Sequence, residues 1–153
     1  MVRILFVCLG NICRSPMAEF IMKDMVKKEG LEDKFYIESA ATSDEEHGNP
    51  VYPPAREMLA SHGISCKGKH ARQMTKADYD SFDLLIGMDE SNIRNMKRIC
   101  PNDEKGKIRM LLDIAGEHRS VADPWYTGNF DATWEDCNRG CRALLELLKK
   151  ETL

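Results

Sequence analysis

The segment Cys8–Pro16 contains the residue types that phosphate chemistry at a cysteine needs. Cys8 ends a short apolar run, and Arg14, six positions later, opens an amphipathic stretch. Five residues between them are enough to curl the backbone into a ring whose successive N–H groups point at one centre and attract an oxyanion. A helix N-terminus adds free N–H groups and its dipole. The spacing therefore predicts an anion-binding loop with a cysteine at its mouth.

The residue types within the loop fit this interpretation. A cysteine beside a helix N-terminus or a cation is drawn toward the thiolate, which is its nucleophilic form. Arg14 offers a planar fork that binds two phosphoryl oxygens at once. We expect Gly10 and Asn11 to adopt positive φ, Ser15 to donate to the thiolate or cap the helix, and Pro16 to occupy the first helical position. The predicted phosphate-binding residues are Leu9, Gly10, Asn11, Ile12, Cys13, Arg14 and Ser15.

Four further motifs accompany the loop: Ser39–Ser43, Ala71–Gln73, Met88–Asn92 and Asp123–Tyr126. Together with Cys8-(five residues)-Arg14-Ser15 at the extreme N-terminus, they resemble the low-molecular-weight protein tyrosine phosphatases, nearly from end to end. The Cys/Arg loop alone is shared with other phosphatases and with arsenate reductases. Its N-terminal position, with a distant Asp-Pro-aromatic-Tyr motif, is much more specific. The resemblance implies a protein tyrosine phosphatase acting through a phosphocysteine.

The composition bounds the class of protein. The chain has 153 residues, of which 42% are hydrophobic and 31% charged, and these values predict one globular domain over 1–153. The formal net charge of −3 argues against nucleic acid as the main partner. No apolar run approaches 18 residues and no signal peptide is recognisable, so we expect a cytoplasmic protein that does not bind membranes. The six cysteines form no CxxC pair, and we expect free thiols.

Apolar runs and periodic stretches alternate along the chain. The predicted strands are Val2–Cys8, Phe35–Ala41, Phe82–Met88 and Ile108–Leu112; the predicted helices are Pro16–Glu29, Pro53–His62, a helix capped by Asp89 that runs to about Ile99, and Phe130–Lys150. This alternation predicts an α/β fold, a doubly wound, flavodoxin-like four-stranded parallel sheet with helices on both faces. Ligands bind at the carboxyl ends of the strands in such sheets, where Cys8 lies.

Asp123 lies in a long loop, and Pro124 restricts it to extended geometry. The local sequence alone favours the interpretation that Asp123 merely starts a turn before proline. The resemblance implies that it is the general acid, which protonates the leaving phenolate and then, as a carboxylate, activates the hydrolytic water. Trp125 and Tyr126 are predicted to form the walls of a deep slot for a phenyl ring, and Leu9 and Ile12 are expected to line the same slot.

The resemblance also implies a set of supporting hydrogen bonds around the loop. Asn11 and Ser15 are expected to hold the loop in shape, and Ser39 is expected to join their network. The family has a histidine two places before the Ala-Arg-Gln motif. That place is Lys69 here, and His70 directly precedes the motif.

Three other features have competing interpretations. Cys13 matches a second cysteine of the family that traps an oxidised nucleophile as a reversible disulfide; it could instead be a small buried hydrophobe. The acidic stretch 44–46 either lines the slot and repels acidic peptides or is a solvated loop. Cys137 and Cys141 lie one helical turn apart without a matching histidine or carboxylate set, so we expect core packing rather than a metal site.

The predicted reaction needs no cofactor and no metal, because Arg14 and the loop N–H groups supply the positive charge. The predicted partners are phosphotyrosine-containing proteins, and inorganic phosphate is the product. Alternative functions are a protein-arginine phosphatase of the same family, which typically has threonine where this chain has Ile12, and a non-catalytic phosphotyrosine-binding module. An arsenate reductase would need further redox cysteines, and Cys100 alone lies in the relevant region.

Overall fold

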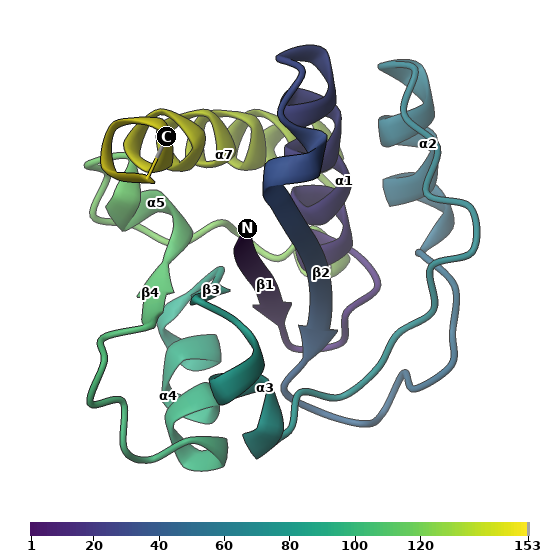
Figure 1. The fold of residues 1–153 in the computed structure, drawn as a ribbon. Coiled ribbons are helices and arrows are strands. Elements are labelled where there is room, and N and C mark those ends of the chain that lie inside the picture. Colours follow the sequence, from purple (N-terminus) through teal and green to yellow (C-terminus); the bar gives the residue numbers. More distant parts are fainter. Residues whose placement is uncertain (153) are drawn as a thin grey trace.

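The computed structural model describes residues 1–152 and is built around one parallel sheet with the strand order β2-β1-β3-β4. The strands are β1 (Val2–Cys8), β2 (Phe35–Ala41), β3 (Leu84–Gly87) and β4 (Ile108–Met110). The helices are α1 (Arg14–Lys28), η1 (Glu32–Lys34), α2 (Pro53–Ser61), α3 (Lys76–Ser81), α4 (Glu90–Ile99), α5 (Leu111–Ile114), α6 (Pro124–Thr127) and α7 (Phe130–Thr152). Figure 1 shows this arrangement and confirms the predicted doubly wound α/β class.

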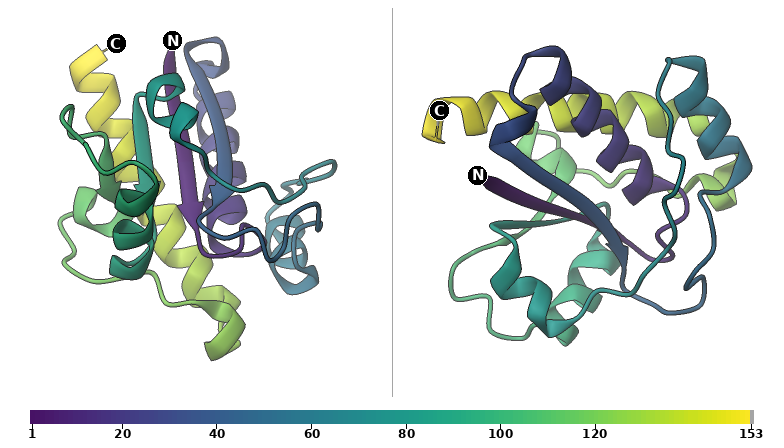
Figure 2. Two further views of the ribbon diagram at one scale, coloured as in Figure 1. Left: turned by 90° about the horizontal axis from the view of Figure 1, so that it is seen from below. Right: turned by 45° about the vertical axis from the view of Figure 1, so that its right-hand side comes forward.

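The central strand β1 is buried on both faces, as its continuous apolar run predicts. Ile4 and Phe6 pack in a core shared with α1, α2 and α7, whereas Leu5 and Val7 pack in a second core with Met96 of α4. The alternation of side chains along β1 therefore separates the two helical layers. The layers are visible in Figures 1 and 2.

The register of the sheet brings the functional loop to one edge. β1 pairs with β2 from Val2↔Phe35 to Cys8↔Ala41, and it pairs with β3 on its other side. Because all three strands are parallel, their carboxyl ends meet at one edge, and the loop between β1 and α1 lies there (Figure 2). This is the edge at which doubly wound sheets bind ligands.

The structure corrects several predicted element boundaries. Phe82 is not the start of a strand but the C-cap of α3, a helix that the sequence analysis missed, and β3 begins at Leu84. β4 stops at Met110 because the chain turns directly into α5. The predicted loop around Asp123 contains the short helix α6. None of the helices in residues 1–152 has the length and apolar composition that a membrane crossing requires.

The long helix α7 approaches α5 closely at Gly140. A Cβ atom added there would lie 2.4 Å from Cγ of the fully buried Leu111. We expect Gly140→Ala to lower the free energy of unfolding by about 1–2 kcal/mol, because overpacking outweighs the roughly 1 kcal/mol gained in helix propensity. Denaturant unfolding measures the change.

The Leu111→Ala background supplies the control for this prediction. With the leucine side chain truncated, Gly140→Ala has space and should no longer destabilise the protein. A gain in stability from Gly140→Ala in the otherwise unchanged chain would contradict the close approach.

Candidate active site

The loop that follows β1 turns its carbonyl groups outward. The carbonyls of Cys8, Leu9 and Ile12 accept hydrogen bonds of 2.9, 3.2 and 2.9 Å from backbone N–H groups of the segment 42–52. The same loop continues into α1 through the carbonyl of Cys13, which accepts from the backbone of Met17 at 3.0 Å. With their carbonyls satisfied outside the ring, the peptide units can present N–H groups to its centre.

Cys8 Sγ lies where the inward N–H groups converge. The backbone N–H groups of Asn11 and Ser15 point at the sulfur, with N···S distances of 3.3 and 3.4 Å. Ser15 Oγ lies 2.9 Å from the same sulfur. Ser15 Oγ also accepts from Asn11 Nδ2 at 2.8 Å. Its single proton therefore faces two acceptors, the Cys8 sulfur and, at 3.5 Å, the Ala40 carbonyl, and the contact with Cys8 is the shorter one. Of the two roles predicted for Ser15, the structure shows the contact with Cys8; Cys13 is the N-cap residue of α1, without a side-chain cap.

Asn11 fixes the turn of the loop. Its φ of 60° lies in the left-handed region, where asparagine is one of the few residue types tolerated. Asn11 Nδ2 donates to Ser15 and, at 2.9 Å, to Ser39 Oγ, and Asn11 Oδ1 accepts from the backbone of Arg72 at 3.2 Å. Ser15 in the same loop and two segments that are distant in sequence therefore hold this residue in place.

Two predictions for the loop backbone were wrong. Gly10 does not adopt positive φ. Its lack of a side chain instead makes space, since a Cβ there would lie 3.3 Å from Cγ of Glu46. Pro16 is the third residue of α1 rather than the first, because the helix already begins at Arg14. The N–H that proline lacks is still one of the unpaired donors of the first helical turn.

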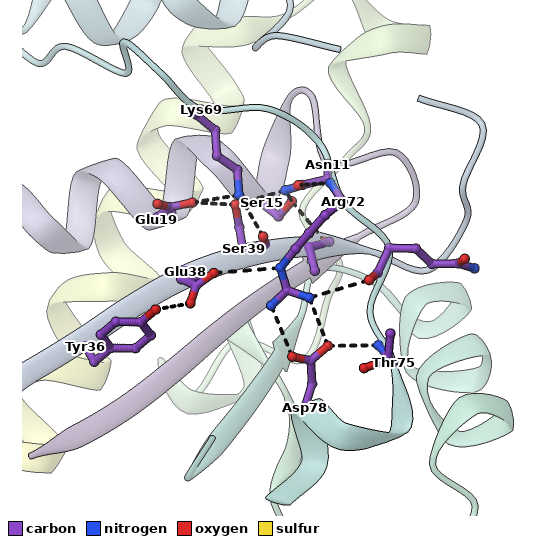
Figure 3. Close-up of polar contacts among 12 residues, drawn as sticks. Asn11, Ser15, Glu19, Tyr36, Glu38, Ser39, Lys69, Arg72, Thr75 and Asp78 are labelled. Carbon is purple, nitrogen blue, oxygen red and sulfur yellow. Dashed lines mark hydrogen bonds and ion pairs between the residues drawn. The ribbon is translucent and has the colours of Figure 1, made fainter. Parts of the chain in front are cut away.

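A buried polar network connects Ser39 with Glu19 and Lys69 (Figure 3). Ser39 Oγ donates to Oε1 of the buried Glu19 at 2.5 Å, and Lys69 Nζ donates to the Ser39 carbonyl at 2.7 Å and lies 3.4 Å from Glu19. Burial lowers the pKa of Lys69, and Glu19 counters this effect. His70 does not enter the network; its Nδ1 faces the Gly48 carbonyl at 3.1 Å. Lys69 thus occupies the position at which the resemblance led us to look for a histidine.

Arg14 is buried, with only 3% of its surface exposed, and its guanidinium is held by polar partners. One terminal nitrogen donates to Asp89 Oδ2 at 2.6 Å and to the Val121 carbonyl at 2.9 Å, and the other lies 3.4 Å from Asp123 Oδ2. Burial opposes the charge of the guanidinium, but Cys8 and the two aspartates outweigh it and raise the pKa of Arg14. The fork is a fixed cation whose orientation is set before a ligand arrives.

Asp123 makes a different contact with each of its two carboxylate oxygens. Its Oδ1 accepts from the backbone of Trp125 at 3.1 Å and caps α6, as expected of an aspartate before proline. Its Oδ2 faces Arg14. Asp123 therefore starts a turn and also presents a carboxyl oxygen to the loop.

These groups line one cavity of about 190 Å³, whose wall comprises Cys8, Leu9, Gly10, Ile12, Cys13, Arg14, Glu45, Glu46, Asp123, Trp125 and Tyr126. Both predicted aromatic residues are on the wall, although 53% of Trp125 and 79% of Tyr126 is exposed. Trp125 packs on Tyr52, with ring centroids 4.8 Å apart. Two of the three residues of the acidic stretch reach the cavity, so its rim is anionic.

Cys13 lines the same cavity as Cys8, and all six cysteines are free thiols within residues 1–152. Burial, followed by Cys8 and Asp123, raises the pKa of Cys13 to about 12, so it is a neutral thiol at physiological pH. The disulfide between Cys13 and Cys8 stays a prediction. Cys137 and Cys141 are fully buried in the core, as predicted.

Asp89 and Glu19 also belong to the site, and neither was predicted from the sequence to do so. Asp89 was predicted only as a helix cap, a role it fills through Oδ1 and the Asn92 N–H at 2.7 Å, while Oδ2 holds Arg14. Glu19 lies one helical turn after Ser15 on α1, so the i,i+4 spacing could have placed it on the same face.

Comparisons with known proteins agree with this geometry. The sequence model of the family described as low molecular weight phosphotyrosine protein phosphatase matches residues 3–153. The chain is 42% identical to the low molecular weight protein-tyrosine-phosphatase YfkJ of Bacillus subtilis, over 99% of this chain and 98% of the relative. It is 43% identical to the low molecular weight phosphotyrosine protein phosphatase of Gallus gallus, over 94% and 93%.

Solved structures extend the comparison. The crystal structure of Bacillus subtilis YfkJ superposes with a TM-score of 0.97, at 41% identity over 100% of this chain and 98% of that one. A Drosophila arginine phosphatase superposes with a TM-score of 0.87, at 28% identity over 95% and 97%. The family match covers nearly the whole chain and the similarities run from end to end, so the chain belongs to the low molecular weight phosphotyrosine protein phosphatase family.

Proposed function

We propose that this chain is a cytoplasmic protein tyrosine phosphatase, a single catalytic domain that hydrolyses phosphotyrosine in proteins, and small aryl phosphates, through a phosphocysteine. One observation carries the proposal: a cysteine sulfur, a buried guanidinium and a carboxyl group, from Cys8, Arg14 and Asp123, line one small cavity. A nucleophile, an oxyanion clamp and a proton donor are the three parts that such a reaction needs.

In the first step Cys8 Sγ attacks phosphorus in line. An S–P bond forms while the bond from phosphorus to the phenolic oxygen breaks. The inward N–H groups of the loop and the guanidinium of Arg14 stabilise the equatorial oxygens, and both are in place beforehand because the outward carbonyls and Asp89 hold them. Ser15 Oγ, at 2.9 Å, stabilises the sulfur as a thiolate.

Asp123 carries the proton in both steps. As a carboxylic acid it protonates the departing phenolate. As a carboxylate it then accepts a proton from the water that attacks the phosphocysteine, so that the S–P bond breaks, inorganic phosphate leaves and the acid is regenerated. Its position at the start of α6, facing the cavity beside Arg14, suits this role.

The shape of the cavity supports aryl over alkyl substrates. Ile12 and Trp125 provide apolar walls above the sulfur, and a phenyl ring can fill the space between them while its phosphate reaches the loop. A serine phosphate has a much shorter reach from its backbone to phosphorus. The same apolar walls favour a tyrosine phosphatase over an arginine phosphatase, because Ile12 has no hydroxyl to orient a guanidinium or a water.

A non-catalytic phosphotyrosine-binding module is the alternative from another functional class. It would need the inward N–H groups and Arg14, but neither a thiol at the base of the cavity nor a carboxyl facing it. The presence of both supports the catalytic reading.

We expect Cys8→Ser to lower hydrolysis of an aryl phosphate on the order of 10³-fold or more, because the hydroxyl is a much weaker nucleophile than the thiolate. The measurement is turnover of para-nitrophenyl phosphate at mildly acidic pH with a reductant and a chelator. Binding of inorganic phosphate to the variant shows that the loop is still formed. Turnover that survives in the variant would mean that another residue is the nucleophile, and a folded, phosphate-binding wild type without turnover would favour the binding module.

The substitution Asp123→Asn removes the acidic proton of the side chain and keeps the oxygen that caps α6. Because Asp123 also serves the second step, which is the same for every substrate, the test uses kcat/KM, which reports the first step alone. We expect kcat/KM for phosphotyrosine to fall by about 10²–10⁴, and much less for an aryl phosphate whose leaving group needs no proton. Kinetics with a series of phenyl phosphates of decreasing leaving-group pKa measures the difference. An equal loss across the series would exclude Asp123 as the general acid.

Ile12→Thr tests the choice between substrates. We expect the ratio of kcat/KM for phosphotyrosine over phosphoarginine peptides to exceed one in the wild type and to fall about tenfold in the variant, since an apolar contact is replaced by a hydroxyl. Ile12→Val is the matched control, because it removes a methylene without adding a polar group. A wild type that prefers phosphoarginine would overturn the substrate assignment.

A further inference from the structure

A second cavity adjoins the phosphate-binding one. It has a volume of about 270 Å³ and shares the walls formed by Ile12, Glu46 and Trp125 with the first cavity. The indole of Trp125, which packs against Tyr52 with the two rings tilted, therefore lies between two cavities rather than at the edge of one. In the proposed reaction the phosphoryl group and its ring occupy the first cavity, which leaves the second to receive another part of a substrate.

The second cavity is apolar for most of its wall and ends at a cation. Its remaining lining comprises Asn49, Pro50, Val51, Tyr52, Pro53 and Arg56. Arg56 lies in the first turn of α2 and is exposed. Among the hydrogen bonds and ion pairs found in residues 1–152, none involves its guanidinium. This charge is available to a ligand at no cost to the fold.

A third cavity of about 630 Å³ continues beyond Arg56 and shares Pro50, Val51 and Arg56 with the second. Lys67 adds another exposed cation to its wall, and Glu57 is the acid there. Lys69 also lines it, but its amine is engaged by Glu19 and Ser39. The three cavities thus form a series in which the surface changes from anionic at the first rim, through apolar, to cationic.

We propose that the second and third cavities bind the polypeptide on one side of the phosphotyrosine, with an apolar side chain in the second cavity and a carboxylate of the substrate at Arg56. This inference rests on the proposed function, because it needs a phosphotyrosine seated in the first cavity. Glu45 and Glu46 at the first rim repel an acid placed immediately beside the phosphotyrosine. The favoured acid therefore lies at least two residues away, beyond the side chain that fills the second cavity.

The test uses phosphotyrosine peptides that differ by one residue. A parent peptide with a neutral background receives glutamate at each of the three positions on either side of the phosphotyrosine in turn, and lysine in a parallel series. The kcat/KM of each peptide is measured at low and high ionic strength for the wild type and for Arg56→Glu. At the position that meets Arg56, we expect the variant to lower kcat/KM for the glutamate peptide by about 3- to 10-fold and to raise it for the lysine peptide, with both effects weaker in salt.

Lys34→Glu is the matched control, since it changes the net charge equally. Lys34 is exposed and lies immediately before β2, at the opposite end of the strand from the phosphate-binding loop. It should leave all peptides unchanged. Para-nitrophenyl phosphate, which reaches only the first cavity, should be hydrolysed equally by the wild type and both variants.

The apolar contact is tested on the substrate. Two versions of the peptide with glutamate at the responsive position are compared. One has leucine and the other has asparagine at the residue between the glutamate and the phosphotyrosine. We expect kcat/KM to fall about 10-fold, the loss typical of one apolar side chain withdrawn from a pocket. No change would exclude the second cavity as its site.

The outcomes separate this inference from the proposed function. If para-nitrophenyl phosphate and peptides are hydrolysed but Arg56→Glu changes every peptide alike, or none, the extended site is refuted and the phosphatase stands. If neither small aryl phosphate nor peptide is hydrolysed by the wild type, the proposed function itself fails.

Discussion

The site depends on one constraint: peptide N–H groups can face an anion only if the carbonyls of the same peptide units find partners elsewhere. Here those partners are backbone N–H groups of the segment 42–52, which donate hydrogen bonds to the carbonyls of Cys8, Leu9 and Ile12. The parallel pairing of β1 with β2 makes this possible, because the segment leaves the sheet beside the loop it supports. The left-handed turn at Asn11 also depends on neighbouring segments, since Ser39 and the backbone of Arg72 hold the side-chain amide of Asn11. Binding chemistry in the loop is therefore a property of the whole sheet edge.

The sequence predicted the central strands well because burial on both faces leaves an uninterrupted apolar signal. β1 and β2 have the predicted bounds. The edge elements were less predictable. α3 begins with a capping box formed by Thr75 and Asp78, a local signal that was present in the sequence but was outweighed by the apolar residues that follow. β4 is only three residues long and turns at once into α5, so nothing in its composition marks where pairing ends.

For the site, the sequence placed the residues of the loop but not their supports. Asp89 caps a helix and holds Arg14 with opposite oxygens of one carboxylate. A local pattern reveals the first role; the second follows only from the adjacency of β1 and β3. Lys69 is fifty residues from Glu19 in the sequence. It comes close because the segment that contains Lys69 and Arg72 is bound to the loop, through the hydrogen bond from the Arg72 backbone to Asn11. The prediction for Gly10 was wrong because this position needs space beneath Glu46 rather than backbone freedom. That need depends on a neighbouring segment, which the local sequence does not show.

The charges of the phosphate cavity explain why recognition of a protein substrate must extend beyond it. Arg14 is opposed there by Asp123, Glu45 and Glu46, so an approaching dianion is repelled at the rim and attracted only at the base, where the guanidinium and the N–H groups lie. In the mechanism that we propose, Asp123 is protonated when the phosphoryl group enters, and the wall of the cavity then carries one negative charge fewer. The form that protonates the leaving group in that mechanism is thus also the form that admits the phosphoryl group most readily. Affinity for one protein substrate over another must then come from groups outside the cavity, and contacts made there contribute to kcat/KM without disturbing the chemistry. In the extended site that we propose, the apolar second cavity is followed by Arg56, whose guanidinium has no hydrogen-bond or ion-pair partner within residues 1–152. Both lie beyond Trp125 and supply such contacts in the order that the rim charges require.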